Sequence, residues 1–215
     1  MCGNQSFRCQ TGPVSVVQQS LVTLDVEGVL IPEIWIAVAE AAGVEALKRT
    51  TRDEPDYDLL MKGRLQHLAD HGLGMEQIQQ VIADLRPLDG AKDFLDELRS
   101  TTQVVLLSDT FRQFGAPMMA HLGYPTLLCH DLVVENDVIV DYRLRMPDQK
   151  RCAVRSFQEL NFSVAAAGDS YNDTTMLGQA DRGYLFNAPA NVIDEFPQFP
   201  AFDSYDDLLN ALLDR

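Results

Sequence analysis

The chain has 215 residues, of which 46% are hydrophobic and 23% charged, and its formal net charge is −15. This length and balance fit a globular protein with one domain and an insertion, or with two small domains. The negative charge argues against nucleic acid and anionic membranes as partners, because its field repels phosphate groups. No apolar run approaches the ~20 residues of a membrane span, and the first residues lack the apolar segment of a secretory signal. We therefore expect the cysteines to be reduced thiols of a cytoplasmic protein, namely Cys2, Cys9, Cys129 and Cys152.

The first part of the chain reads as a tail, one strand and a block of helices. Residues 1–15 are polar and without pattern, and we expect a mobile extension there. A β-leaning apolar run over 16–25 predicts a buried strand. Over 32–85, apolar residues recur at helical spacing, and Pro32 suits the first position of a helix. The helices predicted in this block cover 34–42, 44–48, 56–69 and 75–85.

From Gly90 onward, helices and strands alternate. Helices are predicted over 90–99, 111–122, 150–160, 173–180 and 205–213, strands over 104–107, 126–129, 164–167 and 184–186, and a hairpin over 133–144. Such alternation predicts an α/β fold with a doubly wound, Rossmann-like parallel sheet. We assign 16–31 and 86–215 to this core and 32–85 to a helical cap. Both ends of the cap join the core at the end of the first strand, so the cap should cover the strand ends.

Two acidic loops follow predicted strands. Asp25 and Glu27 end the first strand, and Asp169 and Asp173 follow the strand over 164–167. Parallel strands end at one common edge, so these carboxylates should converge and repel one another unless a cation lies between them. Mg²⁺ is the natural cation for a few oxygen ligands. An aspartate beside Mg²⁺ can attack phosphorus, while a second acid moves protons. Either loop alone also fits turn or capping carboxylates at a surface.

Two further positions suit phosphate binding. Ser108, with Asp109 and Thr110, follows the buried run 104–107 and offers a hydroxyl and backbone N–H groups. The same residues also suit a helix N-cap. Lys150 begins a predicted helix, where it either reaches a phosphate or remains a solvated surface lysine.

In this order, the motifs resemble the haloacid dehalogenase superfamily of aspartyl-phosphate enzymes, from about Leu21 to the C-terminus. GDSYNDTTM looks like the fourth motif of phosphoserine phosphatases. VEGVLIPEIWIA, TTRDEPDYDLLMKGRL and LLSDT resemble the bifunctional phosphoserine phosphatase/phosphoserine:homoserine phosphotransferases. The resemblance implies a small helical cap inserted after the first motif, as the chain order already requires.

The resemblance also assigns the reacting and metal-binding residues. Asp25 would be the nucleophile and Glu27 the acid/base. Mg²⁺ would be held by the side chains of Asp25 and Asp169 and by the backbone carbonyl of Glu27, with Asp173 supporting its waters. Relatives mostly have Asp at the position of Glu27. The metal contact through backbone should tolerate this change, and the longer side chain leaves room for an alcohol acceptor.

Other positions would bind substrate. Ser108 and Lys150 would bind the phosphoryl oxygens, and Asn172 and the Asp109 amide would lie close to the ligand. Many relatives have glycine at the position of Asp109, so its side chain is expected to crowd or tune the phosphate pocket.

In the cap, Glu33 would take the substrate ammonium and Arg64 would clamp its carboxylate. Alternatively, Glu33 is an acid at the start of a helix, where the helix dipole favours it, and Arg64 is an arginine at the rim of the cap.

We thus expect Mg²⁺-dependent hydrolysis of O-phosphoserine to serine and phosphate, with phosphoryl transfer from phosphoserine to homoserine as a second activity. A phosphatase for another small ester and a phospho-accepting signalling domain are the alternatives. Against the signalling domain, Lys150 precedes the last acidic pair. His67 and His71 are expected on a polar helix face, and His130 has no partner nearby in the sequence. The oligomeric state stays open, a homodimer included.

Overall fold

The computed structural model describes residues 17–50, 53–54 and 56–215, so the expected mobile extension, with Cys2 and Cys9, lies outside the described residues. Within the described part, one sheet has the strand order β4-β3-β2-β1-β5-β6-β7. All neighbouring strands are parallel except β3 and β4. The predicted α/β fold is confirmed. The strands are β1 (Gln19–Leu24), β2 (Gln103–Phe111), β3 (Thr126–Glu135), β4 (Val138–Arg143), β5 (Phe162–Gly168), β6 (Arg182–Phe186) and β7 (Ala201–Phe202).

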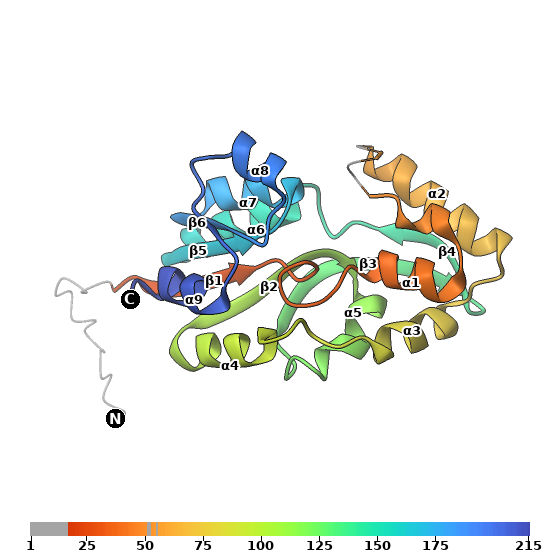
Figure 1. Ribbon diagram of the computed structural model, residues 1–215, viewed down its shortest axis with the longest axis horizontal. Coiled ribbons are helices and arrows are strands. Elements are labelled where there is room, and N and C mark those ends of the chain that lie inside the picture. The colour runs from red at the N-terminus through yellow and green to blue at the C-terminus, as the bar shows by residue number, and fades with distance from the viewer. Residues whose placement is uncertain (1–16, 51–52, 55) are drawn as a thin grey trace, which may run out of the picture.

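Helices cover both faces of the sheet (Figure 1). Before β2, the helices are α1 (Ile34–Ala42), the 3₁₀ helix η1 (Glu45–Lys48), α2 (Tyr57–Asp70), α3 (Met75–Asp84) and α4 (Ala91–Thr101). After β2, they are α5 (Arg112–Met119), α6 (Gln149–Glu159), the 3₁₀ helix η2 (Tyr171–Asp173), α7 (Thr174–Gln179), α8 (Ala190–Glu195) and α9 (Tyr205–Leu213). In Figure 1, α6, α7 and α8 lie on one side of the sheet and α4 on the other, while α1, α2 and α3 gather at the end beside β4. None of the helices described is long and apolar enough to cross a bilayer.

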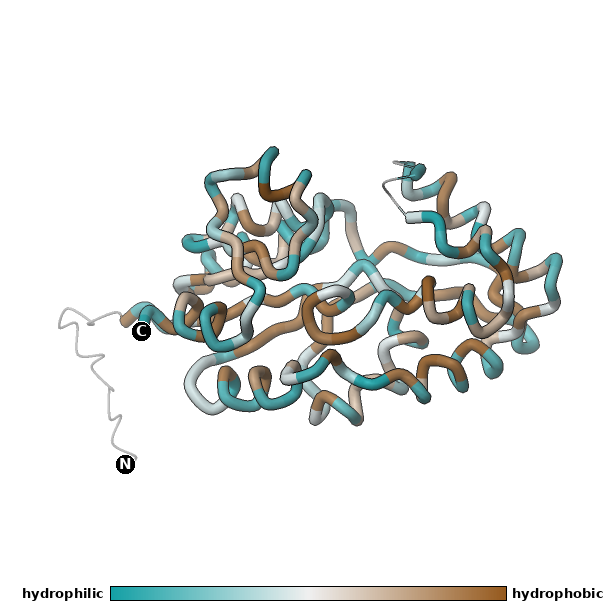
Figure 2. The backbone as a smooth tube through the Cα atoms, in the orientation of Figure 1, coloured by the Kyte–Doolittle hydropathy of each residue, from teal (hydrophilic) through white to brown (hydrophobic). Residues whose placement is uncertain are grey.

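Two hydrophobic clusters hold these layers together. Successive side chains of a strand point to opposite faces, so β1 feeds both clusters. Leu21 packs in the cluster that contains Val154 of α6 and Met176 of α7. Val22 packs in the cluster that contains Phe94 of α4. Burial on both faces explains why the central strands read as nearly continuous apolar runs, which stand out in brown in Figure 2.

The helices between β1 and α4 are not separated from the core by a gap. Trp35 of α1 meets Phe114 of α5 edge to face, with ring centroids 5.3 Å apart, and both belong to one hydrophobic cluster. The β3–β4 hairpin also reaches them. The carbonyl and side chain of Asp137, at the hairpin tip, accept hydrogen bonds from Met75 N and Glu76 N, at 2.7 and 2.8 Å. This part of the chain therefore has a fixed position beside the strand ends.

Some predicted boundaries were wrong. β2 continues to Phe111 instead of ending at Leu107, with a shift in register between these residues. The strand expected over 126–129 and the first arm of the hairpin form one strand, β3, which pairs with β2 and then turns away to pair with β4. The short elements α8 and β7 were not predicted. They are six and two residues long, too short for a hydrophobic period to reveal them.

Candidate active site

The first acidic loop continues directly from β1. Asp25 is buried, and its N–H donates to the carbonyl of Ala167 at 2.9 Å, extending the pairing of β1 with β5. Gly28 then has a φ of 79°, a conformation that suits glycine. A Cβ atom at Gly28 would lie 2.4 Å from Oδ2 of Asp169. The absence of a side chain thus allows this loop to lie against the second acidic loop.

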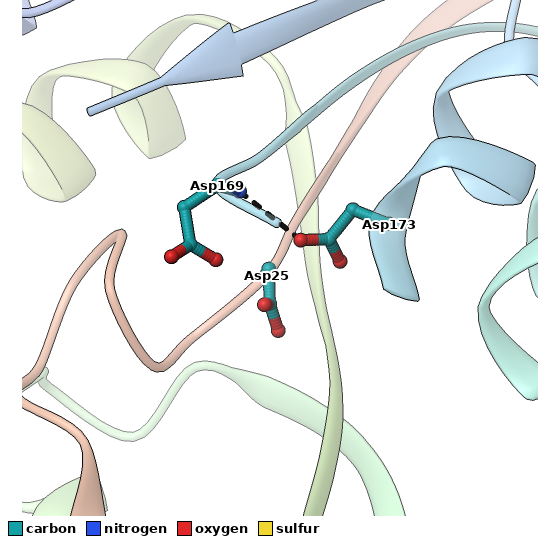
Figure 3. A group of neighbouring side chains, drawn as sticks. All are labelled: Asp25, Asp169 and Asp173. Atoms are coloured by element: carbon teal, nitrogen blue, oxygen red, sulfur yellow. Dashed lines mark hydrogen bonds between the residues drawn. The ribbon is translucent and has the colours of Figure 1, made fainter. Parts of the chain in front are cut away.

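Three aspartates meet where these loops touch. Carboxylate oxygens of Asp25, Asp169 and Asp173 lie within 4.8 Å of one another (Figure 3). Burial, followed by the charge of Asp173, raises the pKa of Asp169 to about 7. Burial and Asp173 also raise the pKa of Asp25 well above its usual range. Their proximity therefore disfavours the ionised forms, and an oxygen-binding divalent cation would relieve the repulsion.

Asp173 is the most enclosed of the three. Its Oδ2 accepts hydrogen bonds from Asp169 N and Ser170 N, at 3.0 and 3.1 Å. Its Oδ1 accepts a bond of 2.7 Å from the Nζ of Lys150. With both oxygens engaged, Asp173 holds the loop and the lysine in position. It is also the third residue of a capping box whose N-cap is Ser170, at the start of the short helix η2, so the capping alternative also applies.

Lys150, at the start of α6, lies in the centre of the acidic group. Its Nζ is 2.9 Å from Oδ1 of Asp25, and its side chain is only 3% exposed. Burial lowers the pKa of this lysine, but Asp173, Asp25 and Asp109 outweigh burial and raise the pKa well above its usual value. The lysine is a buried cation, and the alternative of a solvated surface lysine is wrong.

The residues after the central part of β2 lie next to this lysine. Ser108 is buried, and its hydroxyl accepts a hydrogen bond from Thr110 N at 3.2 Å. The side chain of Asp109 turns toward the lysine, with Oδ2 at 3.5 Å from Lys150 Nζ. Asn172 Nδ2 donates to the same oxygen at 2.9 Å. The predicted phosphate-binding positions are thus adjacent in space.

Glu27 is partly buried and lies against the start of α1. Its Oε2 accepts a hydrogen bond of 2.9 Å from Ile34 N, the first residue of α1. Burial, followed by the charge of Glu33, raises the pKa of Glu27 to about 7. A carboxyl group with this pKa can both give and take a proton near neutral pH.

Arg64 lies inside the helical segment and not at its rim, so the rim alternative is wrong. It is 8% exposed, and its guanidinium carbon is 4.5 Å from the centroid of the Trp35 ring. Nη2 donates to the carbonyl of Arg49 at 2.7 Å, whereas the buried Nε has no hydrogen-bond partner among the described residues. A buried donor without a partner is costly and suits a ligand oxygen. Glu33 is exposed at the N-terminus of α1.

One cavity of about 280 Å³ joins these groups. It is lined by all but one of the predicted site residues, and the exception, Asp173, lies buried beside it. The predicted residues on its wall are Asp25, Glu27, Glu33, Arg64, Ser108, Asp109, Lys150, Asp169 and Asn172. His67 and His71 belong to no group of metal-ligand residues in the described chain.

Three residues that the sequence did not assign to the site, together with Thr110 beside Ser108, also contribute to it. Tyr57 lines the cavity, and its hydroxyl donates to the carbonyl of Asp109 at 3.3 Å. Gln149 and His130 contact the carboxylate of Asp109, and Thr110 lies on the cavity wall. The prediction that His130 has no nearby partner holds only along the sequence, because β3 brings it to Asp109. The position of Gln149, next to Lys150, was the one feature of the sequence that could have indicated a role for any of these residues in the site.

The chain has close relatives among known proteins. It is 59% identical over 189 residues to a phosphoserine phosphatase of Pseudomonas syringae pv. tomato, an alignment that covers 87% of this chain and 80% of the relative. It is 58% identical over 194 residues to phosphoserine phosphatase ThrH of Pseudomonas aeruginosa, covering 90% of this chain and 95% of the relative.

Solved structures share the fold. A phosphoserine phosphatase in its apo form superposes with a TM-score of 0.74 at 20% identity, covering 92% of this chain and 98% of the other. The phospho-aspartyl intermediate analogue of a phosphoserine phosphatase gives 0.71 at 20% identity, covering 86% and 93%. Residues 20–181 match the family of haloacid dehalogenase-like hydrolases. With this match and the two close relatives, the chain belongs to the haloacid dehalogenase-like hydrolases.

Proposed function

We propose that this protein is an Mg²⁺-dependent phosphatase that hydrolyses O-phosphoserine through a phosphorylated Asp25, and that it can also transfer the phosphoryl group to homoserine. The observation that carries the proposal is the position of Lys150, held between Asp25 and Asp173 on the wall of one cavity. The names of the two relatives support phosphoserine as the substrate. A small-molecule reaction of this kind fits a cytoplasmic protein.

The acidic group suits Mg²⁺. Asp25, Asp169 and the carbonyl of Glu27 would hold the cation, and Asp173 would support its waters. All of these are oxygen donors, which Mg²⁺ prefers, and burial, followed by the charge of Asp173, raises the pKa of Asp169, an effect that a bound cation would oppose. When bound, the cation would neutralise charge on the phosphoryl oxygens and on Asp25.

The chain's own groups would divide the chemistry as follows. An oxygen of Asp25 attacks phosphorus and displaces the serine alkoxide, to which Glu27 gives its proton. Glu27 then takes a proton from the water that hydrolyses the acyl phosphate and regenerates Asp25. Lys150 and the Ser108 hydroxyl bind the phosphoryl oxygens, which stabilises the charge of the transition state.

The segment 32–85 would serve as a cap that selects the amino acid. Arg64 has an unused buried Nε for the substrate carboxylate, and exposed Glu33 would attract the ammonium group. These two charges would also exclude phosphate esters without an amino-acid backbone, since each would leave a charged cap residue unpaired.

Transfer to homoserine would depend on Glu27. The hydrogen bond from Ile34 N holds the end of this longer side chain toward α1. We propose that a water or a small alcohol can then be deprotonated in the same position. In the Glu27→Asp variant, the ratio of transfer to hydrolysis should fall, and an unchanged ratio would contradict this role.

The test uses purified protein with Mg²⁺, a panel of phosphate esters, and phosphoserine with and without homoserine. Phosphoserine should be turned over in preference to phosphothreonine and sugar phosphates. Asp25→Asn should lose activity by roughly a thousandfold or more, as is typical when a nucleophile is removed. Preference for another ester would replace phosphoserine as the proposed substrate while leaving the phosphatase assignment in place.

A further inference from the structure

The carboxylate of Asp109 lies among hydrogen-bond donors at the mouth of the site. Gln149 Nε2 donates to its Oδ1 at 3.1 Å, and His130 Nε2 is 3.5 Å from the same oxygen. Asn172 Nδ2 and Lys150 Nζ lie at 2.9 and 3.5 Å from its Oδ2. Asp109 thus engages Lys150, which the proposed function gives to the phosphoryl group, and Asn172, which is expected close to the ligand.

Lys150 has three carboxylate neighbours, and they differ in exposure. The side chains of Asp25 and Asp173 are 6% and 0% exposed, whereas that of Asp109 is 31% exposed. Asp109 is also outside the group of three aspartates suited to a cation. An anion that approaches Lys150 through the cavity therefore meets the charge of Asp109. A bound cation would not neutralise this charge directly, because Asp109 is not one of the proposed metal ligands.

The carboxylate remains charged in this setting. Burial by itself raises the pKa of Asp109, but Lys150, His130 and other donors outweigh burial and hold the pKa well below its usual range. Asp109 is thus an anion at any pH at which the enzyme is expected to work.

We propose that Asp109 competes with the phosphoryl group for Lys150 and Asn172, and so weakens the binding of inorganic phosphate and speeds its release. This inference rests on the proposed function of the site. When phosphate is bound, it repels the carboxylate of Asp109; when phosphate leaves, Asp109 regains both partners. The same repulsion acts on the phosphoryl group of phosphoserine, but there the contacts of the amino-acid part with Arg64 and Glu33 offset it. Inorganic phosphate makes no such contacts, so the repulsion favours its release.

The test compares inorganic phosphate binding in Asp109→Asn and wild type, both saturated with Mg²⁺. Asparagine keeps the size and an acceptor oxygen and removes the charge. The dissociation constant for phosphate, from calorimetry and from product inhibition, should fall about tenfold or more, since unscreened like charges a few ångströms apart easily supply this factor. A role in folding alone would leave phosphate binding unchanged or weaken it.

Asp148→Asn is the matched control. Asp148 and Asp109 line one second cavity of about 200 Å³, and their side chains are 33% and 31% exposed. Asp148 pairs with Arg151 and accepts a hydrogen bond from Thr175, whereas the ion pairs of Lys150 among the described residues are with Asp25, Asp109 and Asp173. Its variant should bind phosphate within about twofold of wild type, because charge falls off with distance and with screening.

Asp109→Gly provides a second variant should the asparagine variant fold poorly. It also removes the negative charge, so it too should bind phosphate more tightly, although loss of the contacts to Asn172 should lower turnover. A folded Asp109→Asn or Asp109→Gly protein that binds phosphate no more tightly than wild type overturns the inference. Calorimetry needs no substrate, so this result is separate from any failure of wild type to hydrolyse phosphoserine.

Discussion

The Nζ atom of Lys150 lies 2.9 Å from Oδ1 of Asp25, and both side chains are almost completely buried. The lysine is the buried counter-ion of the proposed nucleophile. Substituting it leaves carboxylates in a medium of low dielectric constant without a cation, the situation in which buried charges cost most.

Lys150→Gln should therefore lose both stability and activity. Breaking a buried ion pair typically costs about 3–5 kcal/mol, and Asp173 loses the same partner. Thermal unfolding should show a lower midpoint that saturating Mg²⁺ partly restores, since the cation supplies positive charge nearby. Lys62→Gln, at an exposed lysine paired with Asp58, is the control and should unfold close to wild type. Equal stability of the two variants would argue against a buried cation.

Gly28→Ala should strongly reduce activity through the metal site. A Cβ atom at this position would meet Asp169 Oδ2 at 2.4 Å, so either the carboxylate or the loop must move. Gly43→Ala is a matched control, because Gly43 has a similar φ of 68° and no atom within 4 Å of the added Cβ. Both variants should lose about 1–2 kcal/mol of unfolding free energy from the left-handed backbone.

Activity separates the two alanine variants. Gly28→Ala should lower kcat/KM about a hundredfold or more and weaken Mg²⁺ binding, whereas Gly43→Ala should keep the kcat/KM of wild type. These figures reflect displacement of a reacting group by about an ångström. If both variants lose activity equally, backbone strain and not the contact with Asp169 is responsible.

Mg²⁺ should bind more tightly as the pH rises through about 7. Asp169 has a pKa of about 7 in the metal-free protein, so the cation competes with a proton below that pH. Calorimetric titration at pH 6 and pH 8 should show the difference. Asp169→Asn should bind weakly at both values, and a pH-independent affinity for wild type would contradict the role of Asp169.

The same shift predicts how the metal-free protein responds to pH. The folded-state pKa of Asp169 is raised, so the folded state binds the proton more tightly than the unfolded state. Its contribution to stability is complete below the unfolded-state value of about 4 and is lost as the pH rises through about 7. Protein treated with EDTA should thus become easier to unfold as the pH rises from about 4 to about 7. Added Mg²⁺ should reverse this loss of stability.

Glu33→Gln should move the pH dependence of hydrolysis. After burial, the charge of Glu33 is the largest cause of the raised pKa of Glu27, which lies at about 7. Removing that charge lowers the pKa of Glu27 in the free enzyme, so the loss of its protonated form, and with it of kcat/KM, should begin at lower pH. The pH profile of kcat/KM for phosphoserine, which reports the groups of the free enzyme, measures this shift. An unmoved profile would show that the pKa of Glu27 does not determine the loss of activity at high pH.

Much of the fold was predictable because local patterns determine it. The apolar run before Asp25 and the alternation of elements after Gly90 indicated a parallel sheet, whose strand ends had to bring Asp25 and Asp169 together. The extension of β3 into the hairpin was not predictable in the same way. It depends on where the strand stops pairing with β2, which is a tertiary contact.

In the site, the sequence indicated residue types and their common edge but not their partners. His130 and Asp109 are far apart in the chain and meet only because β2 and β3 are neighbours. The burial of Lys150 was also not evident, since two adjacent basic residues, Lys150 and Arg151, are typical of a solvated surface. Its burial depends on Asp25 and Asp173, which lie in the segments that follow β1 and β5.

If the proposed mechanism holds, Asp25 carries the phosphoryl group during turnover. Wild-type enzyme can be mixed with phosphoserine and Mg²⁺, quenched in acid within milliseconds and mapped by peptide mass spectrometry. One phosphoryl group should appear on the peptide that contains Asp25, none should appear in Asp25→Asn, and the group should disappear when substrate is exhausted. Turnover without any phosphorylated peptide, or phosphorylation at another residue, would contradict the account.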